Sequence, residues 1–184
     1  MKNTKFIFVA LWAAILVAMP LSSADAYNYT GRRWGGTNPQ ARINTTKLYL
    51  TSYINTANAV MGEWNYTGAR LTFTSDSNSS SRAFSYYNDV NRILAYAKVY
   101  TYPFTKTIYK ADMGINNYHN FNPPYKSGTY YDLKSVMRHE LGHWLQLDHV
   151  SSSSALMYAY LAPAQVKYIT TDEINGIRAI YGRR

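Results

Sequence analysis

Apolar residues recur with helical spacing in three stretches of the chain. In residues 50–64 they follow the i, i+3, i+4, i+7 rule of an amphipathic helix. Between residues 133 and 144 the apolar positions again fall on one helical face, with Asp132 available as the N-cap. Residues 171–181 form a third such stretch, with Thr170 or Thr171 available as its cap. The pattern therefore predicts three helices.

Shorter apolar stretches separate the first two helices. Residues 70–74, 83–87, 93–100 and 107–116 each have the composition of a β-strand, and the last is predicted to be an edge strand. The small polar residues 75–81 form a loop. Strands grouped between helices indicate a mixed α/β domain.

The second predicted helix carries the clearest chemistry. His139 and His143 are four residues apart, so on a helix both imidazoles lie on one face and can bind one metal ion. Glu140 is the natural general base for water that the metal activates. His149 follows six residues after His143, and an unbroken helix would turn its side chain away by about 240°. For His149 to bind the same ion, the helix must end and the chain must double back.

Three longer motifs carry a family resemblance. The sequences HELGHWLQLDH (139–149), ALMYAY (155–160) and ITTDEINGIRAIYG (169–182) resemble the metzincin metallopeptidases, and among them the matrixins. The resemblance is tight over residues 132–182 and looser from Trp34 onward. It implies the zincin fold: a twisted, mostly parallel five-stranded sheet with two helices, an active-site cleft, and a small C-terminal subdomain with the Met-turn and the final helix.

The resemblance also implies roles for the motif residues. It makes His139, His143 and His149 the ligands of one catalytic zinc, and Glu140 the general base. Met157 becomes the Met-turn residue, an apolar floor beneath the zinc with no catalytic role. The implied activity is that of a zinc-dependent endopeptidase acting on extended protein or peptide substrates.

The chain departs from the family pattern in three places. Gln146 stands where the family usually has the glycine of a left-handed helix end, which costs a non-glycine residue about 1–2 kcal/mol. Because Gln lacks the short side chain of Asn, Gln146→Gly is expected to be neutral or mildly stabilising. Residues 159–161 replace the Pro-x-Tyr wall of the pocket beside the scissile bond, so its specificity does not carry over. His119 is the only histidine outside the catalytic set, so no second, structural zinc is expected.

Two further features follow from the resemblance and the acidic residues. In matrixins an edge strand pairs with the extended substrate, and here it is expected within residues 110–116. Calcium remains possible for this family, but Asp76, Asp89 and Asp112 are too dispersed in the sequence to predict a site.

The first residues of the chain have the form of a secretory signal peptide. Two lysines precede the apolar run 6–19, and the small-residue sequence Ala-Asp-Ala follows at 24–26. The run is shorter than the roughly 20 apolar residues that span a membrane. Residues 1–26 are predicted to be removed, leaving a single catalytic domain at 27–184 that is secreted, extracellular and monomeric.

Composition narrows the partners. The chain has no cysteine, which excludes disulfides and a propeptide thiolate on the zinc. Its formal net charge of +9 favours acidic partners such as anionic polymers. The lysines and arginines are scattered, however, and no nucleic-acid motif accompanies them.

Three alternatives stay open. A zinc hydrolase could take its third ligand from a distal carboxylate, with Glu173 or Asp172 as the candidates. An inactive module could use the cleft to hold peptides or polymers, although the intact Glu140 argues against this. A buried helix could also contain these histidines without metal, although imidazole is an uncommon core side chain.

Overall fold

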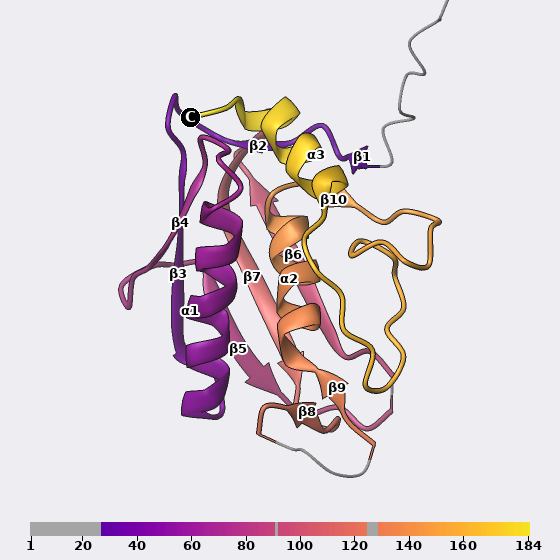
Figure 1. Cartoon of the computed structure of the whole chain (residues 1–184). Helices are drawn as coiled ribbons and strands as arrows, with labels where there is room; N and C mark the ends of the chain where they lie inside the picture. Colours follow the sequence, from indigo (N-terminus) through magenta and orange to yellow (C-terminus); the bar gives the residue numbers. More distant parts are fainter. Residues whose placement is uncertain (1–26, 91, 125–128) are drawn as a thin grey trace, which may run out of the picture.

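The computed structural model describes residues 27–90, 92–124 and 129–184. The predicted signal peptide lies outside these residues. Two long helices lie side by side on one face of a twisted sheet, and a third helix lies at the end of the molecule near the C-terminus (Figure 1). Among the described residues, no helix is long and apolar enough to cross a membrane.

The main sheet has six strands. They are β2 (Arg33–Trp34), β3 (Gln40–Lys47), β4 (Thr72–Ser75), β5 (Arg82–Tyr86), β6 (Ala95–Thr101) and β7 (Thr107–Asn116). The order is β2-β7-β5-β3-β4, with parallel pairing throughout, and β6 adds to β7 antiparallel. The mostly parallel sheet of five longer strands is confirmed, and the short β2 extends it.

Two small pairings complete the strands. β1 (Asn28–Tyr29) pairs antiparallel with β10 (Leu147–Asp148). β8 (Phe121–Asn122) pairs parallel with β9 (Tyr131–Asp132). The first of these pairings brings the start of the described chain beside the segment that leads to His149.

The four predicted strands lie within two residues of their expected bounds, but the sequence pattern missed β3. In β3 only Ala41, Ile43 and Thr45 are buried, and polar residues occupy the other positions. The prediction that residues 107–116 form an edge was wrong. β7 lies between β5 and β6, and its last six residues are buried, so β6 is the outer strand.

The three helices are confirmed as α1 (Thr51–Asn65), α2 (Leu133–Trp144) and α3 (Thr171–Tyr181). The carboxylate of Asp132 accepts a bond from the Ser135 N–H at 2.7 Å, which caps α2 as predicted. Thr170 caps α3 in a reciprocal capping box.

The end of α2 is fixed by aromatic packing. Trp144 is fully buried, and its ring lies 6.4 Å from the rings of both Trp34 and Phe73. The Trp34 Nε1–H donates to the Trp144 carbonyl at 2.8 Å. Since the last carbonyls of a helix have no partner inside it, this bond ties the end of α2 to strand β2.

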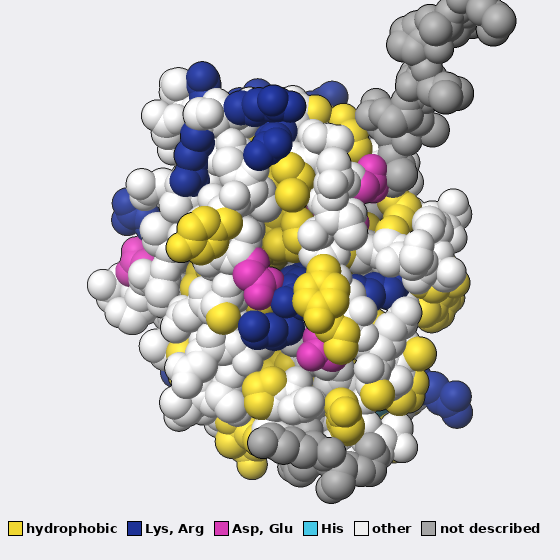
Figure 2. Space-filling model, viewed as in Figure 1, with side chains coloured by type: hydrophobic (Ala, Val, Ile, Leu, Met, Phe, Trp, Pro, Cys, Tyr) yellow, Lys and Arg dark blue, Asp and Glu magenta, His cyan; other side chains and the backbone are white. Residues whose placement is uncertain are grey.

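Arginines that are scattered in the sequence meet at one end of the molecule. Lysine and arginine side chains gather on the part of the surface nearest the C-terminus (Figure 2). There Arg70 donates to the Arg183 carbonyl, Arg178 to the Thr67 carbonyl, and Arg184 to the Leu71 carbonyl. These hydrogen bonds connect the C-terminal segment to the loop after α1, so the three arginines have a structural role.

A charged pair joins the two long helices. Arg138 on α2 is only 4% exposed, and its guanidinium binds both Glu63 carboxylate oxygens at 2.6 and 3.0 Å. Its third nitrogen donates to the Lys167 carbonyl at 2.8 Å. The Arg138 hydrogen bonds lower the pKa of Glu63. Lys134 reaches the same carboxylate from a more exposed position, at 3.5 Å.

We expect Glu63→Ala to reduce the free energy of unfolding by about 2–3 kcal/mol, because it leaves a buried guanidinium without its carboxylate. Lys134→Ala is the matched control, since it removes an exposed contact to the same carboxylate and should cost less than about 1 kcal/mol. Chemical denaturation of both variants measures the difference. Equal losses would show that Arg138 does not depend on Glu63.

Candidate metal centre

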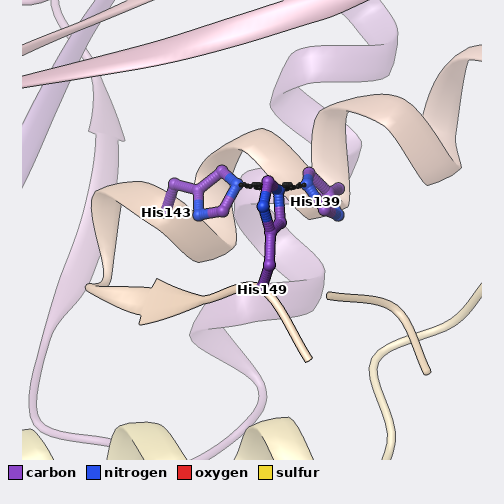
Figure 3. A group of neighbouring side chains, drawn as sticks. All are labelled: His139, His143 and His149. Carbon is purple, nitrogen blue, oxygen red and sulfur yellow. Dashed lines mark hydrogen bonds between the residues drawn. The ribbon is translucent and has the colours of Figure 1, made fainter. Parts of the chain in front are cut away.

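Three imidazoles meet at one point beside α2. His139 and His143 project from consecutive turns of the helix, and His149 reaches them from the segment after β10 (Figure 3). Their Nε2 atoms lie 3.0 Å apart for His139 and His143, and 3.2 Å apart for each of these with His149. A zinc ion at about 2.0–2.1 Å from three nitrogens in tetrahedral geometry holds them about 3.3 Å apart.

The other ring nitrogens fix the tautomer of the two helical histidines. His139 Nδ1 lies 2.8 Å from the Leu156 carbonyl, and His143 Nδ1 lies 2.8 Å from the Leu147 carbonyl. A carbonyl only accepts, so each Nδ1 carries the proton and each Nε2 presents a lone pair. Lone pairs that converge at this distance repel one another unless a cation lies between them. The donor set therefore fits zinc.

Burial keeps these imidazoles neutral. It lowers the pKa of His139 to about 3, with the neighbouring His143 as the second cause. Burial also lowers the pKa of His143. Only the neutral ring has a free lone pair, so both side chains are held in the form that binds a metal.

The chain turns back at Gln146, as the spacing of His149 requires. Gln146 has a φ of 73°, in the left-handed region that favours glycine. The expectation that its side chain cannot offset this strain was wrong. Gln146 is 2% exposed, its amide nitrogen donates to the His143 carbonyl at 2.9 Å, and its amide oxygen accepts from the Thr30 hydroxyl.

Strand β1 holds the returning segment in place. Tyr29 pairs with Leu147, and the Thr30 N–H donates to the Gln146 carbonyl at 3.3 Å. The Asn28 amide donates to the carbonyl of His149 itself at 2.6 Å. These contacts could not be predicted from the sequence, because residues 28–30 contain no motif.

Met157, the predicted Met-turn residue, packs against α2 at Gly142. It is 1% exposed, and its carbonyl accepts from the Val150 N–H at 3.1 Å. A Cβ on Gly142 would lie 2.6 Å from the Met157 sulfur. The absence of a side chain at Gly142 therefore allows the Met157 sulfur to pack against α2 one residue before His143.

Glu140 lies beside the three-histidine group with its carboxyl buried. The side chain lines the same cavity as the histidines, and its Oε2 has no hydrogen-bond partner among the described residues. Burial raises the pKa of Glu140 to about 8. A nearby dication favours the ionised form of such a carboxyl, so this group is placed to exchange a proton beside a metal.

The histidines open into a cavity of about 580 Å³. Strand β6 and the residues before it, 92–97, form one part of its lining. Helix α2 and the segment 156–161 form another, and Lys167 also lines it. The predicted substrate-pairing strand within 110–116 does not line this cavity. The outer strand next to the cavity is β6. It precedes the strand that was predicted to be the edge.

Lys167 is a cavity residue that sequence reasoning missed. It is 5% exposed, and its ammonium donates to the carbonyls of Ala155 and Tyr160 at 2.8 and 3.3 Å. The ammonium also lies 4.9 Å from the centre of the Tyr158 ring. Burial lowers the pKa of Lys167, and Glu173 opposes the shift. A single lysine in a loop carries no signal that could have identified it.

The distal carboxylate proposed as an alternative ligand has a different partner. Glu173 Oε2 accepts from the Thr170 N–H at 2.8 Å and from the Thr170 hydroxyl at 2.6 Å. In the part of the chain that the structure describes, the one group of three or more potential metal ligands is His139, His143 and His149. The geometry therefore favours His149 over Glu173 as third ligand.

The Gln146 contacts change the expected effect of a glycine there. Gln146→Gly relieves about 1 kcal/mol of backbone strain but removes two side-chain hydrogen bonds of about 1 kcal/mol each. We now expect it to lower the free energy of unfolding by about 1 kcal/mol. Gln146→Val loses both bonds and adds about 1 kcal/mol of further strain, because a β-branched side chain fits a positive φ poorly, so it should cost about 3 kcal/mol.

Thermal unfolding of the three zinc-loaded proteins would rank them. A glycine variant more stable than the wild type would show that the two amide hydrogen bonds contribute little. A valine variant as stable as the wild type would show that the backbone does not need the left-handed conformation.

Comparison with known proteins agrees with this geometry. A family model described as Matrixin matches residues 54–182. A matrix-metalloproteinase-like protein of Trichoplusia ni ascovirus 2c is 24% identical over 204 residues, which cover 97% of this chain and 39% of that protein. Metalloendoproteinase 1-MMP of Arabidopsis thaliana is 46% identical over 52 residues, covering 28% and 14%. Interstitial collagenase of Sus scrofa is 47% identical over 53 residues, covering 28% and 11%.

The chain thus spans 39% or less of the length of these three relatives. The family match is more extensive within the chain itself, because it begins in α1 and ends just after α3. It contains the whole three-histidine group, Glu140 and Met157. The chain belongs to the matrixin family.

Proposed function

We propose that this protein is a secreted zinc-dependent endopeptidase that cleaves peptide bonds in extended protein substrates. The observation that carries the proposal is the convergence of three imidazole Nε2 atoms beside a buried carboxyl in an open cavity. Membership of the matrixin family supports the same activity.

His139, His143 and His149 would hold the ion, and three neutral ligands leave its charge intact and a position open. When bound, zinc supplies a Lewis acid that polarises the substrate carbonyl and acidifies water. Glu140 accepts the proton of the attacking water and returns it to the leaving amine. Met157 supports the helix from below and takes no part in proton transfer.

The substrate would bind along β6. This strand is the free side of the β6–β7 pair, and residues 94–97 line the cavity that contains the histidines. An extended peptide added to a strand edge gains main-chain hydrogen bonds with little side-chain selectivity. Pockets beside the bond would then set the preference among substrates.

Export and processing belong to the same proposal. The apolar run and the Ala-Asp-Ala sequence support cleavage after Ala26 and a mature catalytic domain at 27–184. The basic charge supports contact with anionic polymers outside the cell. We propose a monomer as the working form.

Glu140→Gln should reduce peptide hydrolysis by about 10²–10⁴-fold and leave the zinc content and the fold intact. Gln has the shape of Glu but cannot take a proton. Asp76→Asn, a carboxyl-to-amide change on a surface loop, is the matched control. Initial rates on casein, together with metal analysis, test the prediction. A glutamine variant with more than a tenth of normal activity would exclude Glu140 as the base.

Metal analysis of the purified protein should find about one zinc per chain. His149→Ala removes one of the three nitrogens and should cause loss of most of the zinc during dialysis against a chelator. His119→Ala, at the fourth histidine, is the control and should retain it. If His149→Ala kept its zinc and activity, the distal-carboxylate alternative would replace the proposed ligand set.

A further inference from the structure

The cavity beside the histidines contains more positive than negative side chains. Arg92 and Lys167, from two different segments, both line it. Among the described residues that line it, the only acidic one is Glu140, which the proposed mechanism already uses. A bound zinc ion would add further positive charge. A cavity with this balance attracts an acidic ligand group more strongly than a neutral one.

Lys167 is the more buried of the two cations, since Arg92 is exposed. The residue is 5% exposed, although it lines an open cavity. Its ammonium has three N–H groups, and the described residues supply two acceptors, the carbonyls of Ala155 and Tyr160. None of the described carboxylates forms an ion pair with it.

The nearest acidic influence on Lys167 comes from Glu173, whose carboxylate is engaged in capping α3. A desolvated ammonium with neutral partners alone binds a carboxylate more strongly than a hydrated surface lysine does. Val136, Leu156 and Leu161 make part of the nearby lining apolar, and hydroxyl groups of Ser135, Tyr158 and Tyr160 are the neutral polar groups beside them.

The position of Lys167 relates it to the reacting bond. Its backbone N–H donates to the hydroxyl of Ser135 at 2.7 Å, and Ser135 lies one turn before His139 on α2. Its ammonium holds residues 155 and 160, on either side of Met157 and Tyr158. When the scissile bond lies at the histidines, a neighbouring substrate side chain that enters the cavity therefore meets the part of the lining formed by Lys167 and the segment 156–161.

We propose that Lys167 makes the enzyme select substrates with an acidic side chain, Asp or Glu, next to the scissile bond. The inference rests on the proposed peptidase function and names its substrate class. Lys167 is a specificity residue that contacts the substrate side chain, and Arg92 adds to the attraction as the substrate enters.

The test uses a peptide library with both residues that flank the cleaved bond randomised, read by mass spectrometry. The zinc-loaded wild type should favour Asp and Glu over Asn and Gln by about tenfold at one flanking position. Lys167→Met should remove that preference, and Lys167→Arg should retain it. Equal cleavage of Glu and Gln substrates by the wild type, or enrichment of Leu at both positions, would overturn the inference.

A binding measurement separates this inference from the peptidase function. Zinc-loaded Glu140→Gln protein is titrated with two peptides that differ only in Glu or Gln at the selected position. About tenfold tighter binding of the Glu peptide supports the inference even if the wild type cleaves neither, which would refute the peptidase function alone. Equal affinities for the two peptides overturn the inference and leave the peptidase function standing.

Discussion

The close approach of three imidazole Nε2 atoms sets the strictest geometric requirement in this molecule. The Leu156 and Leu147 carbonyls hold the protons of His139 and His143 on Nδ1, so their Nε2 atoms have only electrons to offer one another. A cation between them turns the repulsion into a stabilising interaction. The same ion then contributes to folding, because the ligand set exists only when α2 and the returning segment are both in place.

The returning segment depends on residues that are remote in sequence. His149 lies six positions after His143, and a continuing helix would turn the His149 ring away from the other two. Gln146 breaks the helix with a positive φ, and its amide bonds satisfy the His143 carbonyl and Thr30. Trp34 binds the last carbonyl of α2, and Asn28 binds the carbonyl of His149. The start of the described domain therefore completes the metal centre.

Local chemistry explains what could be predicted from the sequence. The helix caps at Asp132 and Thr170 follow from interactions within a few residues, and the break at Gln146 was expected from the spacing of His149. Strand β3 was not predicted because six of its eight residues are polar. The order of β6 and β7 could not be predicted, because the hydrophobic periodicity of two paired strands does not show which of them is the outer strand. The position of Lys167 in the cavity could not be predicted, because its partners are backbone carbonyls, and any residue type can supply a backbone carbonyl.

The residues proposed to hold the metal and the residues that give the cavity its positive charge lie on different segments of the chain. The groups that hold metal and move the proton lie within residues 139–149, where spacing and helix geometry constrain each position. The charge of the cavity comes from Arg92 and Lys167, on segments that supply no ligand. Neither residue is one of the three histidines, so a substitution there changes the charge of the cavity and keeps the full set of imidazole ligands. Under the proposed function, the attraction for substrate can therefore change while the ligand set is kept.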